Sequence, residues 1–332
     1  MALGLTALLE TVERPQSSDR TLHYHVRTIP GFPSHYIGLT SNGLPCLLLG
    51  AAESGVKAPI RLSAIEVSFA VPCRIALEGG EERTEPLTSI ACTSSDPTVR
   101  RYFIHVCETI LQIVGTSPTL QEVIEAVMRL VDLFQRLSSP PRRSVVGLFG
   151  ELYFIGVARS PAAAVTAWRS TIDDRFDFSV EDVRIEVKTS GTRQRSHEFS
   201  LEQCIPPPDT SGVLVSLFAE ASGGGLSLQE LVERIEAKLG SDYDLLLKFQ
   251  EAVAEALGAS ASDALSMRFD ESLAKSSLQV FDLSAIPAIR AQISPQVSQV
   301  RFRSDLSQTA PAVKSALISS CSALRDLLPA GA

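Results

Sequence analysis

The segment 183–188 alternates strictly between apolar and polar side chains, and this pattern restricts the fold more than any other feature of the sequence. Its apolar positions are Val183, Ile185 and Val187, and the charged positions between them are Arg184, Glu186 and Lys188. Successive side chains of a β-strand point to opposite faces of a sheet. The segment is therefore predicted to be a strand that presents Glu186 and Lys188 together on one face.

A second strand-like segment, 175–180, precedes the first by two residues. If the two form a hairpin in which Val180 pairs with Val183, Asp177 lies opposite Glu186. Directly opposed residues have Cβ atoms about 4.5 to 5.5 Å apart, so these carboxylates would repel each other unless a cation lay between them. A divalent metal ion meets this need economically. A loop with an odd number of residues would instead shift the pairing by one position and turn Asp177 to the other face.

The stretch 144–158 is predicted to be a helix with a broad apolar face. Residues on that face are Val145, Leu148, Phe149, Leu152 and Ile155. Glu151 is the one charged residue of the stretch, and a lone carboxylate is costly to bury without a partner or a metal ion. Gly147 and Gly150 would let the helix approach a sheet closely, because glycine has no side chain.

Pro140 and Pro141 interrupt the helical pattern, since proline lacks an amide donor and disfavours helical backbone at the residue before it. We place a domain boundary there. Residues 1–138 would form a β-rich domain with two trailing helices, and residues 139–332 a second domain with a helical C-terminal extension. The further elements expected in the second domain are a helical stretch at 227–257 that begins with a Ser227–Glu230 capping box, strands at 213–218, 278–283 and 297–302, and a closing helix at 312–328.

Composition narrows the function classes. The chain has 332 residues, enough for two domains, with 30 Lys and Arg against 38 Asp and Glu and a net charge of -8. This balance excludes disorder and collagen, and it argues against non-specific coating of nucleic acid, which needs basic residues in bulk, although it is compatible with a local basic groove. We find no CxxC pair, signal peptide or membrane-length apolar run, so we expect a soluble cytoplasmic protein without a membrane partner.

The sequence resembles the PD-(D/E)XK nuclease superfamily, and within it an uncharacterised bacterial branch found beside restriction and phage-defence genes. The matching positions fall within residues 144–205 and are Gly147–Leu152, Trp168, Asp177 and Phe178, the tripeptide Glu186-Val187-Lys188 with Thr189, and His197 followed by Gln203. Phe176 stands where the superfamily name expects proline, at a position that is commonly relaxed.

The resemblance implies an α/β fold, with a restriction-endonuclease-like core of a mixed sheet flanked by helices and a β-rich N-terminal domain. It also implies roles for residues. Asp177 and Glu186 would ligate Mg²⁺, for which Mn²⁺ could substitute, and Lys188 would act on the attacking water. Glu151 would supply an outer metal contact, and Gln203, as an auxiliary residue, would lie near the lysine side of the site.

The function implied is that of a metal-dependent endonuclease, which hydrolyses phosphodiester bonds in nucleic acid, with DNA as the expected substrate, in a restriction-modification or phage-defence setting. Cleavage of both strands would indicate a homodimer, because one such site cuts one strand. The alternative is a non-catalytic nuclease-fold subunit that binds DNA or other subunits of a defence complex. The acidic net charge favours this alternative modestly.

Other polar residues near the tripeptide give less specific signals. His197 could be an auxiliary general base, or equally a histidine bonded within a loop. Arg193 and Arg195 could contact phosphate, or belong to a solvated loop. Asp173 and Asp174 could compete as metal ligands, although solvation in a loop is the simpler interpretation.

A second tripeptide of the same form, Glu236-Ala237-Lys238, lies inside the helical stretch that begins at Ser227. We expect it on a solvated helix face. A tripeptide of this kind is uninformative without its structural context.

Overall fold

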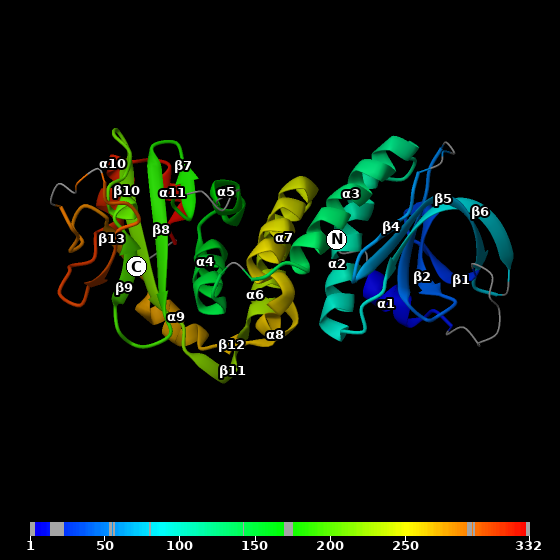
Figure 1. Ribbon diagram of the computed structural model, residues 1–332, viewed down its shortest axis with the longest axis horizontal. Helices are drawn as coiled ribbons and strands as arrows, with labels where there is room; N and C mark the ends of the chain where they lie inside the picture. The colour runs from blue at the N-terminus through cyan, green and yellow to red at the C-terminus, as the bar shows by residue number, and fades with distance from the viewer. Residues whose placement is uncertain are drawn as a thin grey trace. The chain divides into compact units, whose positions relative to one another are not determined.

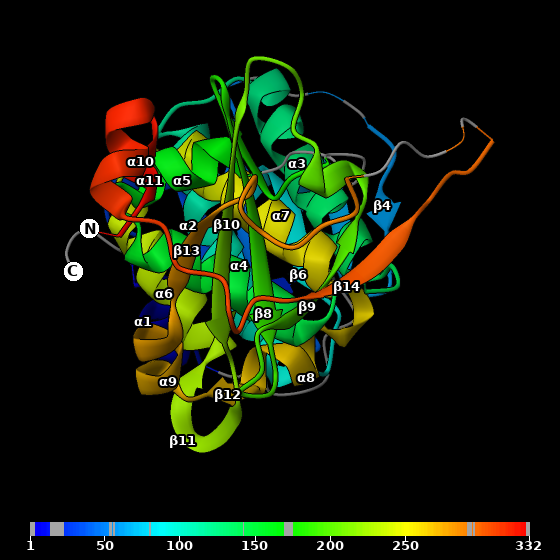
Figure 2. The same ribbon diagram turned by 90° about the vertical axis from the view of Figure 1, so that its left-hand side faces the viewer.

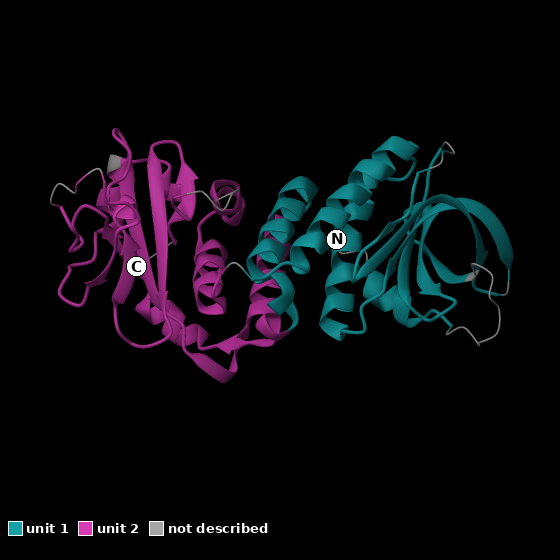
Figure 3. Cartoon of the chain, in the orientation of Figure 1, with its two compact units in different colours: residues 1–142, 241–262 teal, residues 143–240, 263–332 magenta. Residues whose placement is uncertain are grey.

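The computed structural model describes residues 4–13, 23–52, 55, 57–79, 81–141, 143–168, 175–290, 294 and 296–329. Asp173 and Asp174 lie outside them. The chain divides into two compact units (Figure 3): unit 1 contains residues 1–142 and 241–262, and unit 2 contains residues 143–240 and 263–332. The expected boundary followed residue 138, and the segment 241–262 was expected in the second domain. The segment belongs to unit 1 because Leu247 and Ala254 join the hydrophobic core of that unit.

Unit 1 is built on a six-stranded sheet (Figure 1) with the order β1-β2-β3-β6-β5-β4. Its strands are β1 (His23–Ile29), β2 (Phe32–Thr40), β3 (Pro45–Gly50), β4 (Ile60–Arg61), β5 (Ile65–Ala76) and β6 (Glu82–Cys92). Neighbours in this order pair antiparallel, and β1 also pairs in parallel with β5. The sheet therefore curls on itself and encloses a small core of its own, which includes Tyr24, Leu48 and Ile75.

The helices of unit 1 pack against this curled sheet and against one another. They are α1 (Leu5–Glu10), α2 (Pro97–Val114), α3 (Leu120–Leu137) and α7 (Tyr243–Leu257), followed by η2 (Gly258–Ser260) and the start of α8 (Ala261–Ser266). A large apolar cluster joins the sheet to these helices, with Phe103 and Phe134 among its fully buried side chains. Within the described residues, no helix combines the length and the apolar character needed to cross a membrane.

Unit 2 contains the predicted site residues Asp177, Glu186 and Lys188. Its helices are α4 (Val145–Val157), α5 (Pro161–Ala167), α6 (Leu228–Leu239), α9 (Glu271–Ser277), α10 (Lys314–Ser320) and α11 (Leu324–Leu327), with a short η1 (Glu202–Cys204). Its strands are β7 (Phe178–Val180), β8 (Val183–Ser190), β9 (Ser196–Ser200), β10 (Ser211–Phe218), β11 (Ala221–Ser227), β12 (Arg268–Phe269), β13 (Gln279–Asp282) and β14 (Arg301–Asp305).

The central sheet of unit 2 has the order β13-β10-β8-β7, and Figure 2 shows β13, β10 and β8 side by side. β8 and β10 are parallel, whereas the two outer pairs are antiparallel. β9 and β14 form a separate antiparallel ribbon. Helices flank the sheet, so the expected α/β class with a mixed sheet is confirmed.

The predicted hairpin register is confirmed. Val180 pairs with Val183 and Phe178 with Ile185, around a turn of two residues. Glu181 in this turn has a positive φ of 46°, which is uncommon for a residue other than glycine. β7 is shorter than expected, because its paired residues begin at Phe178.

Helix α4 packs closely on β8 at Gly150. A Cβ atom added there would lie 1.7 Å from Oγ1 of Thr189, so only glycine fits. Ser144 caps the start of the helix by accepting a hydrogen bond from the amide of Gly147 at 3.1 Å. The role predicted for Gly150 is thereby confirmed, whereas at Gly147 a Cβ atom would meet only the capping hydroxyl, at 3.0 Å.

Several elements differ from the expectation. The stretch 227–257 begins with the predicted capping box but splits into α6 and α7 at Gly240, whose φ is positive. The expectation that Glu236-Ala237-Lys238 lies on a solvated face is wrong for Glu236, which is buried, and the ammonium of Lys238 donates to the carbonyl of Gly156 at 2.6 Å.

We predict that Gly150→Ala lowers the free energy of unfolding by about 2 kcal/mol or more, because the new methyl group would overlap Thr189 and push α4 away from β8. Urea denaturation measures the effect. Gly147→Ala in the same helix is the matched control and should change the free energy by less than about 1 kcal/mol. Equal effects of the two substitutions would contradict the packing described for Gly150.

Candidate active site

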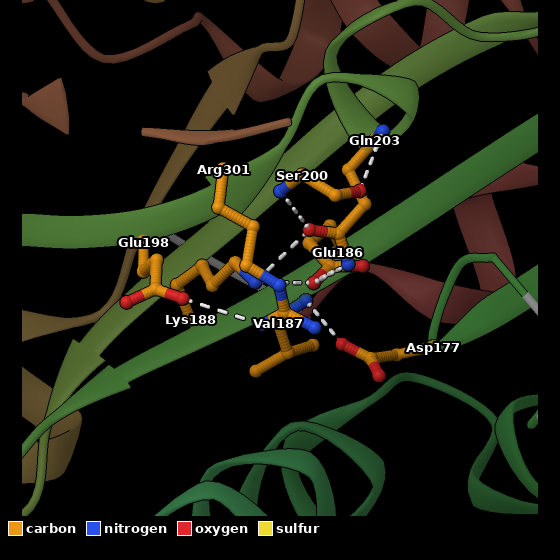
Figure 4. A network of polar contacts seen from close by, with 8 residues as sticks. All are labelled: Asp177, Glu186, Val187, Lys188, Glu198, Ser200, Gln203 and Arg301. Atoms are coloured by element: carbon orange, nitrogen blue, oxygen red, sulfur yellow. Dashed lines mark hydrogen bonds and ion pairs between the residues drawn. The ribbon is translucent and has the colours of Figure 1, made fainter. Parts of the chain in front are cut away.

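Two buried carboxylates come from neighbouring positions of β7 and β8. Asp177 directly precedes β7, and Glu186 lies one step beyond the last paired residues of the hairpin. Oδ2 of Asp177 accepts a hydrogen bond from the amide of Val187 at 2.8 Å (Figure 4). Both carboxylates are almost fully removed from water. The hairpin register thus brings together the two acidic residues that the sequence singled out.

The two oxygens of Glu186 have different surroundings. Oε1 accepts hydrogen bonds from Nζ of Lys188 and from Nε2 of Gln203, each at 2.7 Å. Oε2 is buried, and none of the described residues donates a hydrogen bond to it. Buried oxygens of this kind are rare in folded proteins, because the loss of water is then uncompensated. Oε2 is therefore available to a further ligand.

Burial and the charge of Asp177 raise the pKa of Glu186 from 4.5 to about 8. The nearby ammonium of Lys188 acts in the opposite direction, and the charge of Glu151 adds to the rise. Removal from water disfavours the ionised form of an acid, and a second negative charge disfavours it further. The raised pKa means that Glu186 tends to hold a proton, and a cation bound at this carboxylate would take the place of that proton.

Lys188 places a cation directly beside this acidic pair. Besides its contact with Glu186, its Nζ donates to Oε1 of Gln203 at 3.3 Å and lies 5.2 Å from the centre of the Phe199 ring. The side chain is 20% exposed, so it is only partly withdrawn from solvent while its ammonium is held by the site. The alternation of apolar and charged residues along β8 predicted that Glu186 and Lys188 share one face of the strand.

Gln203 ties the parts of the site together. It lies in η1, directly after β9, and its Nε2 donates to Glu186. Its Oε1 accepts from Lys188 and from the amide of Ser200, the latter at 3.1 Å (Figure 4). One amide group therefore fixes the positions of both the carboxylate and the ammonium.

Glu151 is buried on α4, but it does not share ligand geometry with the acidic pair. Its Oε2 accepts from the guanidinium of Arg143 and from Nε1 of Trp168, the latter at 2.8 Å. Among the described residues, no group of three or more His, Cys, Asp or Glu side chains is arranged to hold a metal ion. The role of Glu151 as a metal contact thus rests on the resemblance.

The remaining candidates have structural partners. His197 on β9 is buried, its Nε2 lies 2.8 Å from Oγ of Ser216, and burial lowers its pKa to about 4. Arg195 donates to the carbonyl of Ser216 at 3.0 Å and to that of Ser277. Arg193, an exposed residue, forms a two-pronged ion pair with Glu220. These contacts favour structural roles for His197 and Arg195 over direct participation in catalysis.

The sequence reading missed three residues that shape the site. From the sequence alone, Arg143 fits either a phosphate contact or a helix boundary beside Pro140 and Pro141. Ser200 carries no sequence signal for this site, and Phe199 lies on a strand that was not predicted. In the segment 196–200 the buried residues His197 and Phe199 alternate with polar ones, so strand periodicity was the available signal.

A mixed sheet flanked by helices, with Glu186 and Lys188 on the central strand β8 and Asp177 directly before the neighbouring strand β7, defines a nuclease-like class of protein. A family model described as "Putative PD-(D/E)XK family member, (DUF4420)" matches residues 7–307. The chain belongs to this family, and the restriction-endonuclease-like fold expected from the resemblance is confirmed. No curated protein and no solved structure matches the chain.

The raised pKa of Glu186 predicts a pH-dependent stability. Between pH values of about 5 and 8 the folded state holds a proton at Glu186 that the unfolded state has released, so the contribution of this group to stability is lost as the pH rises. We expect the free energy of unfolding of the wild type, relative to Glu186→Gln, to fall by a few kcal/mol (roughly 2–4) across that range. Urea denaturation at a series of pH values measures it; parallel curves for the two proteins would refute it.

Proposed function

We propose that this protein is a metal-dependent nuclease that hydrolyses phosphodiester bonds, with Asp177, Glu186 and Lys188 as its catalytic residues. The observation that carries the proposal is Oε2 of Glu186, a buried carboxylate oxygen to which none of the described residues donates. The second buried carboxylate, Asp177, raises the pKa of Glu186 and so marks a place of concentrated negative charge. Membership of the PD-(D/E)XK family supports the same reaction class.

Asp177 and Glu186 fit a divalent cation. Mg²⁺ prefers carboxylate oxygens and is commonly held by one or two protein carboxylates, so Mg²⁺ is the proposed cofactor and Mn²⁺ a substitute. When bound, such a cation supplies charge neutralisation at the phosphate and lowers the pKa of water. Glu151 is proposed to affect this site from α4, through its charge.

Lys188 would act on the nucleophile and the phosphate. An ammonium has three N–H donors, and two of those of Lys188 are directed to Glu186 and Gln203. The third can donate to the attacking water or to a phosphate oxygen, where negative charge develops during hydrolysis. Gln203 is the proposed auxiliary residue because it holds the ammonium and Glu186 in a fixed relation. Arg193, which is exposed, is a proposed phosphate contact.

DNA is the proposed substrate, cleaved internally, and the proposed setting is restriction or phage defence; both rest on the resemblance. Cleavage of both strands would then involve a homodimer. The second candidate function is that of a non-catalytic nuclease-fold subunit that binds DNA or partner proteins. The net charge of -8 favours the form of this alternative that binds partner proteins, because an acidic protein gains little from general attraction to phosphates.

Cleavage of supercoiled plasmid DNA in Mg²⁺ or Mn²⁺ separates the two functions. We expect Lys188→Ala and Asp177→Asn to lower the cleavage rate by at least about 100-fold, since each removes a group that acts on the transition state. Lys275→Ala, which removes a lysine from α9, is the matched control and should cleave like the wild type. EDTA should abolish cleavage.

Cleavage that persists in Lys188→Ala would refute the assignment of the site. A pure wild-type protein that neither cleaves nor binds Mn²⁺ would favour the non-catalytic subunit.

A further inference from the structure

The burial of Glu151 is not explained by the acidic pair of Asp177 and Glu186. It is the charged residue of an otherwise apolar helix, and its side chain is buried against the body of unit 2. A buried carboxylate is tolerated when cations or N–H donors compensate for the lost water. Its partners therefore show which role the structure gives to it.

Two of these partners come from outside α4. Arg143, immediately before the capping residue of the helix, extends its guanidinium to Oε2 of Glu151. Trp168, which follows α5, donates its indole N–H to the same oxygen at 2.8 Å. The guanidinium carbon of Arg143 lies 5.6 Å from the centre of the Trp168 ring, so these two partners also contact each other through a cation–π interaction. We call Arg143, Glu151 and Trp168 the arginine triad.

The triad is connected to the strand that carries the acidic pair. Trp168 forms a β-bridge with Phe178, the first residue of β7, and Asp177 is the residue directly before it. The bridge therefore joins the backbone at Trp168 to the residue next to Asp177. Through this bridge the triad links the start of α4, the end of α5 and the position of one carboxylate of the site.

The triad also balances its own charge. Arg143 neutralises Glu151, just as Lys188 faces Glu186 across 2.7 Å. Within the described residues, Glu151 does not form a three-ligand group with the acidic pair. The geometry therefore gives Glu151 a counter-ion of protein origin in place of a metal ion.

We propose that the arginine triad is a positioning unit, in which Glu151 anchors Arg143 and Trp168, and that the divalent cation is held by the side chains of Asp177 and Glu186 without Glu151. This inference rests on the proposed function, because it presumes that a cation binds. It changes the role that the resemblance implies for Glu151, from a metal contact to a positioning residue. Arg143 becomes a positioning residue as well.

Isothermal titration calorimetry with Mn²⁺ on the full chain tests the proposal. Asp177→Asn should lose binding, as a ligand is removed. Glu151→Gln should weaken binding by about tenfold, since it leaves the charge of Arg143 uncompensated near the site. The new amide oxygen can still accept from Trp168 and Arg143, so Glu151→Gln should retain measurable binding, in contrast to Asp177→Asn.

The outcomes separate the two proposals. Loss of binding in Glu151→Gln as complete as in Asp177→Asn would show that Glu151 is a ligand and would overturn the inference, while the proposed function stands. A wild-type protein that binds no Mn²⁺ would overturn the proposed function, and the inference with it.

A measurement on the wild-type protein avoids any dependence on the folding of variants. Trp168 is the single tryptophan of the chain, so its indole N–H gives one resonance in a protein labelled with ¹⁵N-tryptophan. If Glu151 remains bonded to Trp168, this N–H stays protected from solvent exchange when Mg²⁺ saturates the protein. Release of the N–H to fast exchange on addition of Mg²⁺ would overturn the inference.

Discussion

Repulsion between Asp177 and Glu186, both removed from water, is the constraint on which the rest of the site depends. Two buried carboxylates at neighbouring strand positions destabilise each other. The amide of Val187 donates to Asp177, and Lys188 and Gln203 donate to Oε1 of Glu186. None of the described residues donates to Oε2 of Glu186. A sheet of purely structural purpose would fill these positions with apolar residues, because replacing a buried ion pair in this way is often neutral or stabilising. The retained charge is the physical reason to assign the site a chemical role.

The surrounding elements hold this charge in place. Gly150 lets α4 lie directly on β8, which brings Glu151 within electrostatic reach of Glu186. The charge of Glu151 would make the repulsion worse, but Arg143 neutralises it, and Trp168 joins the triad to the strand that follows Asp177. Each acidic residue added to the site is thus accompanied by a basic residue or a fixed donor. Under the proposed function, a divalent cation would complete this balance at Oε2 of Glu186, to which none of the described residues donates.

Local rules in the sequence predicted the parts of this site that depend on neighbouring residues. The alternation of β8 and the two-residue turn were enough to place Asp177 near Glu186, because strand geometry leaves little freedom over such a short hairpin. Contacts between residues distant in the sequence were not predictable in the same way. The positions of Gln203 and Arg143 depend on β9 and on the path of α4, and the assignment of α7 to unit 1 depends on packing of Leu247 and Ala254. Tertiary packing determines such contacts, and the periodicity of apolar residues carries no information about which distant segments pack together.

We propose that Asp177 and Glu186 hold one divalent cation beside Lys188. A crystal structure of the protein soaked with Mn²⁺, with data collected near the manganese absorption edge, tests it most directly. The account predicts an anomalous peak with carboxylate oxygens of Asp177 and Glu186 about 2.0–2.4 Å away, one of them Oε2 of Glu186, while Glu151 keeps its bonds to Arg143 and Trp168. Well-ordered crystals with no peak at these carboxylates, or with a peak elsewhere alone, would contradict it.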